Sequence, residues 1–466
     1  MGLVEGYDSE SSDASNYDGH EEVGQLQHLH NDANSQTTSK NNDTSRDSDN
    51  VVITELDHTK RRLKYSKSEL RSFRKKRKSD SPWGKWSESE SINSESDLEV
   101  NTDLNEYQDE SQFKTLEKDV AEKSTFHGES EKDYKGRSFT YPPIDVECDL
   151  QKPALSFKCY LPKKEIYVYQ GHRHGTTSLE FFPKTGHLFV SGGNDNVIRI
   201  WDFYHKRELL RDYIGHSKAI KTTNFNDDGK MFISSSFDKY VKIWDTETGK
   251  VRSKLRLNST PNDVKFRPLN PNEYIVGLSN SQIKHYDTRV SEKQGLIQVY
   301  DHHQSSILNL RYFPDGTKFI SSSEDKSVRI WENQINIPIK QISDTAQHSM
   351  PFINIHPQGH YFSTQSMDNT IYSFGMKPKY KRYPKKTFKG HTSSGFGIEL
   401  AFSPDGKYIC SGDANSRLFI WDWVTTRLLR TFEVPGKKPV TQVAWNPQET
   451  SKVICSGQTG EIYLYD

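Results

Sequence analysis

The sequence predicts an all-β fold, a seven-bladed β-propeller, and three observations support this: a repeat, its period and its turn residues. Residues 215–245 open with Gly-His and close with Trp-Asp, and between them lie three short runs in which apolar and polar residues alternate. Turn residues separate these runs, which is typical of antiparallel strands. Further copies end at spacings of 42 to 47 residues, close to the period of about 40–45 residues for such blades. The blade-ending aromatic residues are Trp201, Trp244, Tyr286, Trp331, Phe374, Trp421 and Tyr465.

The two ends of the repeat region complement each other. The last copy stops at Tyr465-Asp466 and therefore lacks a fourth strand, whereas the run Glu-Ile-Tyr-Val-Tyr at 165–169 precedes the first Gly-His and has no blade of its own. We expect this run to supply the missing strand and close the ring, which removes the free sheet edges. The propeller is therefore assigned to residues 165–466.

Three copies carry a His, a Ser, an Asp and a Trp at recurring spacings. A catalytic set would not recur in blade after blade, so these residues predict a hydrogen-bonded chain inside each blade, with the Asp in the turn before the Trp. The pair His302-His303 suggests metal ligands, but His302 falls at the position of the repeat histidine and is assigned to structure. The predicted tetrads are His172, Ser191, Asp195 and Trp201; His216, Ser234, Asp238 and Trp244; and His302, Ser321, Asp325 and Trp331.

The remaining composition excludes several classes of protein. The four cysteines, Cys148, Cys159, Cys410 and Cys455, show no CxxC spacing, which argues against a zinc site or a disulfide framework and fits a reducing compartment. No apolar run approaches the roughly 18–20 residues that span a membrane. No nucleophile stands apart from the repeat. We therefore expect no enzyme activity, cofactor, metal, membrane contact or small-molecule substrate.

Residues 1–125 read as a disordered charged tail, because they hold too few apolar residues to offset the entropy of ordering. Within it, residues 60–78 contain eleven Lys or Arg and one Glu. Two basic clusters separated by a spacer match a two-part nuclear import signal, but they also suit RNA phosphates or a solvated linker. These clusters are Lys60, Arg61 and Arg62, and then Arg74, Lys75, Lys76, Arg77 and Lys78.

Aromatic residues in polar surroundings mark candidate docking points for partners. Trp83 and Trp86 lie in a polar run, and Trp is favoured at binding hot spots; a local hydrophobic cluster without a partner is the alternative. An acidic run at 87–110, with nine acidic and no basic residues, follows them. Residues 126–164, with Tyr134 and Tyr141, are too irregular for a blade and too apolar for a free tail, so we expect an extended segment that packs on the propeller or on partners.

The longest repeat spacing, between Phe374 and Trp421, contains a basic and aromatic stretch at 377–386. We expect it in the turn between the third and fourth strands of the fifth blade. Its composition suits a single-stranded RNA contact, an acidic protein surface or a solvated loop. The residues are Lys377, Lys379, Tyr380, Lys381, Arg382, Tyr383, Lys385 and Lys386.

The repeat region resembles Trp-Asp (WD40) repeat proteins, and longer stretches resemble one family. The runs EKDYKGRSFTYPPIDVECDL, KTGHLFVSGGND, SSSEDKSVRIWENQ and PQETSKVICSG, and more loosely MGLVEGYD and PWGKW, are similar to fungal members of the pre-mRNA-processing factor 17 family. This resemblance implies a nuclear protein of the spliceosome, with spliceosomal proteins and small nuclear ribonucleoproteins as partners. The basic segments described above are the candidates for direct contact with small nuclear RNA or pre-mRNA. The resemblance also implies support of exon ligation, the second transesterification, and a link to cell-cycle progression.

The propeller fold by itself is compatible with a second function, because a fold alone does not fix function. The chain is then a substrate receptor or scaffold of a ubiquitin ligase or a chromatin complex. That reading predicts a peptide-binding pocket at the central channel and no dependence on RNA.

Overall fold

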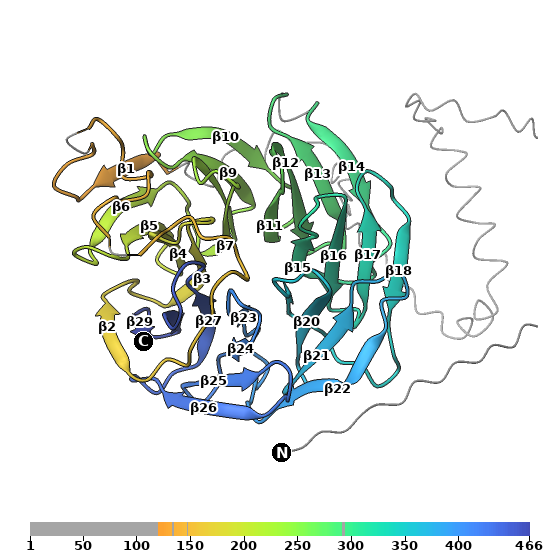
Figure 1. The fold of residues 1–466 in the computed structure, drawn as a ribbon. Helices are drawn as coiled ribbons and strands as arrows, with labels where there is room; N and C mark the ends of the chain where they lie inside the picture. The colour runs from red at the N-terminus through yellow and green to blue at the C-terminus, as the bar shows by residue number, and fades with distance from the viewer. Residues whose placement is uncertain (1–119, 133–134, 147, 291–293) are drawn as a thin grey trace, which may run out of the picture. The chain divides into compact units, whose positions relative to one another are not determined.

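The computed structural model describes residues 120–132, 135–146, 148–290 and 294–466. Within these residues the chain forms strands β1 to β29 and no helix. The strands make seven sheets arranged as a ring around a central axis (Figure 1). The predicted seven-bladed propeller is therefore confirmed.

The first four blades run in chain order, each from its innermost to its outermost strand. Blade 1 contains β3 (Thr176–Phe181), β4 (Leu188–Gly193), β5 (Val197–Asp202) and β6 (Leu209–Ile214); blade 2 contains β7 (Ile220–Phe225), β8 (Met231–Ser236), β9 (Tyr240–Asp245) and β10 (Val251–Arg256). Blade 3 contains β11 (Pro261–Arg267), β12 (Asn270–Leu278), β13 (Ile283–Asp287) and β14 (Leu296–Tyr300); blade 4 contains β15 (Ile307–Tyr312), β16 (Lys318–Ser323), β17 (Val328–Glu332) and β18 (Pro338–Ile342).

The last three blades follow the same order until the chain closes the ring. Blade 5 contains β19 (Phe352–Ile355), β20 (Tyr361–Ser366), β21 (Thr370–Gly375) and β22 (Arg382–Lys389); blade 6 contains β23 (Leu400–Phe402), β24 (Tyr408–Ser411), β25 (Arg417–Asp422) and β26 (Leu428–Glu433). Blade 7 contains β27 (Val440–Trp445), β28 (Val453–Gly457), β29 (Ile462–Tyr465) and, as its outermost strand, β2 (Glu165–Tyr169).

The closure of the ring by β2 is confirmed. β2 pairs antiparallel with β29, so that Tyr169 lies opposite Ile462 and Glu165 opposite Tyr465, and Figure 1 shows the two strands side by side. Tyr169 is 1% exposed, and its ring packs edge-on against Phe189 of blade 1 at 5.0 Å. The closing strand therefore joins blade 7 to blade 1 as well as completing its own sheet.

The burial of each strand follows from its place in the blade. β4 and β28 are buried along their whole length, whereas the outer strands β18 and β26 are largely exposed. Between neighbouring strands, an aromatic pair stacks with ring centroids 6.2 Å apart in three blades, and such offset pairs add to simple burial. These pairs are Phe189 with Trp201, Phe232 with Trp244, and Phe319 with Trp331.

Polar side chains on the inner strands tie blades 3, 4 and 5 to one another. Asp263 of β11 accepts hydrogen bonds from the Asn309 side chain at 2.8 Å and the Leu310 amide at 2.7 Å in β15. Asn309 in turn accepts from the amide of Ile353 in β19 at 3.0 Å. Because such bonds are buried, leaving one partner unpaired is costly, and the blades are held as one rigid disc.

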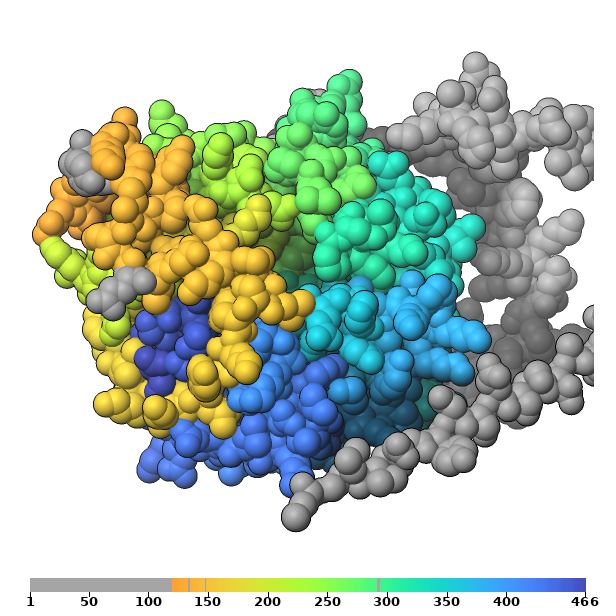
Figure 2. Space-filling view, viewed as in Figure 1, coloured from red at the N-terminus to blue at the C-terminus, as the bar shows by residue number. Residues whose placement is uncertain are grey.

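A segment that precedes β2 lies along the propeller. β1 (Lys123–Phe126) pairs antiparallel with β6 and adds a fifth strand to the outer edge of blade 1. β1 begins inside the range that the sequence assigned to the tail, whose predicted limit was residue 125. In the space-filling view this orange and yellow segment covers blades on one side of the face shown (Figure 2).

Candidate interaction surfaces

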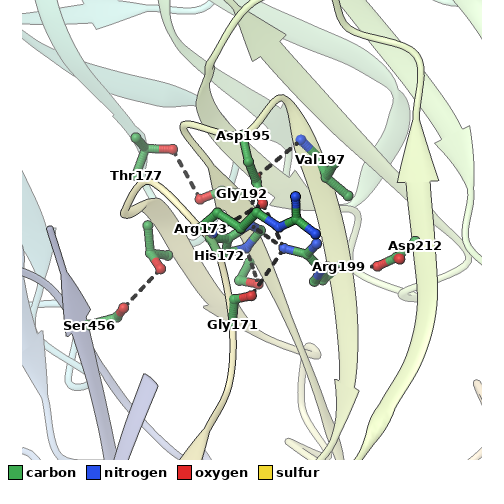
Figure 3. A network of polar contacts seen from close by, with 12 residues as sticks. Gly171, His172, Arg173, Thr177, Gly192, Asp195, Val197, Arg199, Asp212 and Ser456 are labelled. Carbon is green, nitrogen blue, oxygen red and sulfur yellow. Dashed lines mark hydrogen bonds and ion pairs between the residues drawn. The ribbon is translucent and has the colours of Figure 1, made fainter. Parts of the chain in front are cut away.

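In each of blades 1 and 2, the His, Ser and Asp side chains and the Trp indole form a chain of hydrogen bonds within the blade. In blade 1, His172 contacts the Asp195 carboxylate through Nδ1 at 2.8 Å (Figure 3). It contacts the Ser191 hydroxyl through Nε2 at 2.8 Å, and the Trp201 indole donates to Ser191 at 2.9 Å. His216, Ser234, Asp238 and Trp244 repeat the same distances in blade 2. Both serines are fully buried, so a substrate cannot reach them.

Blade 1 adds a cation to this chain. Arg199 lies 2.9 Å from Asp195 and 3.1 Å from Asp212 (Figure 3). Burial opposes ionisation of Asp195, but hydrogen bonds from His172 and Arg199 outweigh it and hold the pKa of this carboxyl below its ordinary value. The arrangement keeps a charged carboxylate at the turn and fixes the histidine ring.

In blade 4 the predicted histidine was wrong by one residue. His303, not His302, contacts Asp325 at 2.8 Å and Ser321 at 2.7 Å, and Trp331 donates to Ser321 at 2.8 Å. The side chain of His302 is 41% exposed and lies near Asp301.

The cause of this error is an irregularity in blade 1. Blade 1 has one extra residue between Phe181 and Phe189, in the turn between β3 and β4, which lengthens the His-to-Ser spacing there. A better signal is the buried aromatic residue three positions before each histidine. It precedes His172, His216 and His303 as Tyr169, Tyr213 and Tyr300.

Buried histidines make the stability of the propeller sensitive to acid. Burial lowers the pKa of His187 and His391 to about 4 and lowers that of His303 below its ordinary value. Because these folded-state pKa values lie below the unfolded value of about 6.5, the stability is fully present above pH 6.5 and falls as the pH drops toward 4. His205 is bonded to Asp145 and Asp202, and these bonds raise its pKa despite its partial burial. Its contribution to stability is therefore lost as the pH rises, in contrast to that of the other three histidines.

We therefore expect the free energy of unfolding to fall between pH 7 and pH 5, by about 2 kcal/mol for each of His187 and His391. The measurement is the urea midpoint of unfolding at several pH values. The variant His391→Gln should show a smaller dependence on pH than the unchanged chain. A midpoint that stays constant from pH 7 to pH 5 would contradict this expectation.

The segment before β2 is held by buried cations of blades 1 and 2. Lys242 of β9 is 2% exposed, and its ammonium group donates to Glu122 at 2.6 Å and to the Gly215 carbonyl at 2.8 Å. Arg211 of β6 is 4% exposed, donates to Glu131 at 2.7 Å and lies over the ring of Phe126 at 5.2 Å. The sequence interpretation missed these anchors, although basic residues at inward positions of strands signal an acidic partner.

Two further contacts hold the later part of this segment. The amide of Cys159 donates to Asp405 at 2.8 Å, and the Arg430 guanidinium donates to the Pro162 carbonyl at 2.6 Å. Beside the segment lies a cavity of 640 Å³ that Phe126, Phe139 and Tyr141 help to line. Tyr141 is 55% exposed, so its ring is accessible to a partner.

The substitution Glu122→Gln should loosen β1, because it removes the charged partner of a buried lysine. We expect a loss of about 1–2 kcal/mol in the free energy of unfolding and faster cleavage by trypsin at Lys123. The matched control is Glu129→Gln, since Glu129 pairs with Lys206 and both side chains are mostly exposed. Equal protease resistance in the two variants would show that Glu122 does not anchor the strand.

The basic stretch of blade 5 is divided between a turn and a strand. Lys377, Lys379 and Lys381 are exposed in or beside the turn between β21 and β22, whereas Arg382, Tyr383, Lys385 and Lys386 lie in β22. Tyr380 was predicted as a docking residue, but its ring is 4% exposed and packs in the core cluster with Phe313 and Phe374. It anchors the turn and is not available to a partner.

Other predicted contact residues are not among those that the structure describes. These are the basic clusters within 60–78, the pair Trp83 and Trp86, and Tyr134. Over the described ranges, no group of three or more His, Cys, Asp or Glu side chains is arranged to hold a metal ion, and no helix could cross a membrane. The four cysteines are free.

Known proteins resemble this chain both in its repeats and over its whole length. The WD domain, G-beta repeat family matches residues 163–202, 207–245, 294–332 and 382–422, and each of these ranges ends one residue after a blade tryptophan. Pre-mRNA-processing factor 17 of Saccharomyces cerevisiae is 58% identical over 100% of both chains. Its Homo sapiens counterpart is 39% identical over 83% of this chain and 66% of its own length. WD repeat-containing protein 25 of Mus musculus is 23% identical over 57% of this chain and 51% of its own.

Proposed function

The chain belongs to the pre-mRNA-processing factor 17 family, and we propose that it acts as a non-catalytic scaffold of the spliceosome. In this role it supports the second transesterification, exon ligation, and it influences cell-cycle progression through the splicing of particular transcripts. The observation that carries the proposal is the 58% identity to the yeast factor, which extends over the whole length of both proteins. Such identity reaches beyond the features that any propeller shares.

The geometry of the propeller suits a scaffold. Its recurring His, Ser and Asp side chains are bonded to one another inside the blades, so they stabilise the disc and do not face a ligand. A rigid disc with a segment fixed along it can hold several partners in one arrangement. Tyr141 and the basic stretch of blade 5 are the exposed docking candidates among the described residues.

The region before residue 120 supplies the other proposed contacts. The basic run 60–78 would direct nuclear import, contact RNA, or do both, and Trp83 and Trp86 would dock on spliceosomal proteins. The proposed partners are spliceosomal proteins and small nuclear ribonucleoproteins in the nucleus. No membrane and no small-molecule substrate take part.

Affinity purification of the full chain from nuclear extract, with and without RNase, tests this proposal. We expect small nuclear RNAs, spliceosomal proteins and lariat intermediates in the untreated sample, and fewer of them after RNase. Extract depleted of the protein should accumulate the products of the first transesterification, and purified protein should restore exon ligation. RNase-insensitive recovery of ubiquitin-ligase or chromatin subunits, without small nuclear RNA, would overturn it.

A further inference from the structure

The outer half of blade 5 carries charge of one sign. Residues 369–398 contain seven Lys or Arg and no Asp or Glu. None of these seven cations forms an ion pair with a carboxylate in the described part of the chain. We call residues 377–389 the cationic strip. Its exposed members are Lys377, Lys379, Lys381, Arg382, Lys385 and Lys389. Unpaired cations gathered this closely repel one another, which favours the binding of an anion with repeated charges.

The turn at the start of the cationic strip is anchored by a buried tyrosine. Tyr380 is buried against the core between blades 4 and 5, and its amide donates to the Lys377 carbonyl at 2.7 Å. Lys379 and Lys381 flank this anchor and are both exposed. The two cations are therefore presented outward by a rigid turn, which lowers the entropic cost of binding.

The register of β22 places a bulge in the middle of the strip. Arg382 lies opposite Phe374 and Thr387 opposite Tyr372, so five steps along β22 match two along β21. The same interval in blade 6 takes three steps. The prediction that the extra residues lie in the turn is therefore corrected, because part of them form this bulge. Pro384 lies within it, and a proline or a bulge at an outer strand hinders pairing with another strand.

The bulge turns an aromatic residue outward beside the cations. Lys386 donates to the Trp423 carbonyl at 3.0 Å and lies 4.3 Å from the Trp423 ring, which fixes the bulge against blade 6. Tyr383 packs edge-on against Tyr361 at 5.3 Å and remains 40% exposed. A supported and accessible ring next to lysines is the combination that stacks a base and binds its phosphate.

A cavity opens beside Arg382, at the start of β22 and next to the turn. It has a volume of 370 Å³, and Arg382 lines it together with Ile342, Met350, Tyr372 and one carboxylate, that of Asp344. The Arg382 guanidinium lies 3.8 Å from the centre of the Tyr372 ring. This volume is at the lower end of the range for small-ligand pockets, about 300–1,000 Å³. A flat apolar group such as a base has a place to enter beside a cation.

We propose that the cationic strip of blade 5 binds a short stretch of single-stranded RNA. The lysines hold successive phosphates, and a base stacks on Tyr383. An acidic peptide is the competing ligand, but extended peptides bind sheet edges through backbone pairing, which the bulge and Pro384 obstruct. The strand of eight residues is about 26 Å long, enough for the roughly four nucleotides of the smallest single-strand sites.

The strip is also accessible in this structure. The segment before β2 contacts blades 1, 2, 6 and 7 through Arg211, Lys242, Arg430 and the loop around Gln448, and Figure 2 shows the light-blue region of blade 5 beyond it. The inference deepens the proposed function and rests on it for the presence of RNA. It adds the site at which that RNA is held.

A binding assay with matched variants tests the proposal. Full-length protein is titrated into a labelled oligouridylate at several salt concentrations, and fluorescence anisotropy reports binding. The strip variant changes Lys377, Lys379, Lys381 and Lys385 to Gln, which leaves Arg382 and Lys386 in their packed positions. The control variant changes four other exposed lysines, Lys230, Lys239, Lys250 and Lys326, to Gln. The basic run 60–78 is present in both.

We expect the strip variant alone to bind more weakly and with less dependence on salt. The slope of log K against log salt should become shallower by about 0.7 for each lost phosphate contact, up to about 3 for all four. Ultraviolet crosslinking of the unchanged protein should label the peptide that contains Tyr383.

Equal slopes for the two variants would overturn the proposal, and so would crosslinks only outside 377–389. A strip variant that loses affinity for polyglutamate but not for RNA would assign the strip to an acidic protein instead. Because the assay uses purified protein and a synthetic oligonucleotide, its failure is separate from a failure to co-purify the spliceosome.

Discussion

Replacing β2, residues 165–169, with Gly-Ser-Gly-Ser-Gly in the full chain is expected to abolish the cooperative unfolding of the propeller. The change removes the fourth strand of blade 7 and the ring of Tyr169 from its contacts with Phe189 and Trp201. Loss of a buried aromatic ring alone costs about 3–5 kcal/mol, and the exposed edge of β29 adds to it. The total approaches the whole stability of a typical domain, about 5–15 kcal/mol.

Thermal unfolding followed by near-ultraviolet circular dichroism measures this effect. The matched control replaces β1, residues 123–126, with Gly-Ser-Gly-Ser. β1 also pairs with an outer strand, but it is a fifth strand on a blade that is already complete. We expect the control to lose about 2 kcal/mol or less and to unfold in one transition. If both replacements lower the melting temperature equally, β2 does not close the ring.

The substitution His303→Ala is expected to destabilise the protein by about 2–4 kcal/mol, whereas His302→Ala should change stability by less than about 0.5 kcal/mol. The ring of His303 is buried between Asp325 and Ser321. Its removal leaves a cavity and a buried carboxylate with fewer donors, and both effects cost free energy. His302 is partly exposed, and surface substitutions are usually small in effect.

Urea unfolding of the two single variants provides the comparison, because the residues are adjacent and chemically identical. The added variant Ser321→Ala should resemble His303→Ala, since Ser321 joins the histidine to the indole of Trp331. A larger loss in His302→Ala than in His303→Ala would restore the original assignment and contradict the observed contacts.

The repeat made the architecture accessible from the sequence alone. The Trp-Asp and Gly-His pairs recur because each blade needs the same turn, the same buried indole and the same histidine. The short repeated pattern therefore predicts the architecture of the whole ring. Even the closing strand could be predicted, because the last repeat lacks a fourth strand and the run at 165–169 belongs to no other repeat. The sequence did not show which histidine of the run Asp301-His302-His303 occupies the repeat position, because the spacing from either one to Ser321 also occurs in another blade.

The surfaces were harder to predict because exposure is not periodic. Tyr380 and Tyr383 look equivalent in the sequence, but one fills the core between blades and the other points outward. The anchors of the segment before β2 depend on pairs far apart in the chain, such as Glu122 with Lys242. Nothing near either residue indicates the other, so this contact required the structure.

The pairing of β2 with β29 also constrains how the protein is made. About 300 residues separate Tyr169 from its partner Ile462, and a ribosome adding about 5–20 residues per second needs roughly 15–60 s to cover them. During that time the nascent chain carries an unpaired strand with two tyrosines, an isoleucine and a valine. Such an edge invites pairing with other nascent chains, so the protein should depend on chaperones until synthesis reaches its last blade.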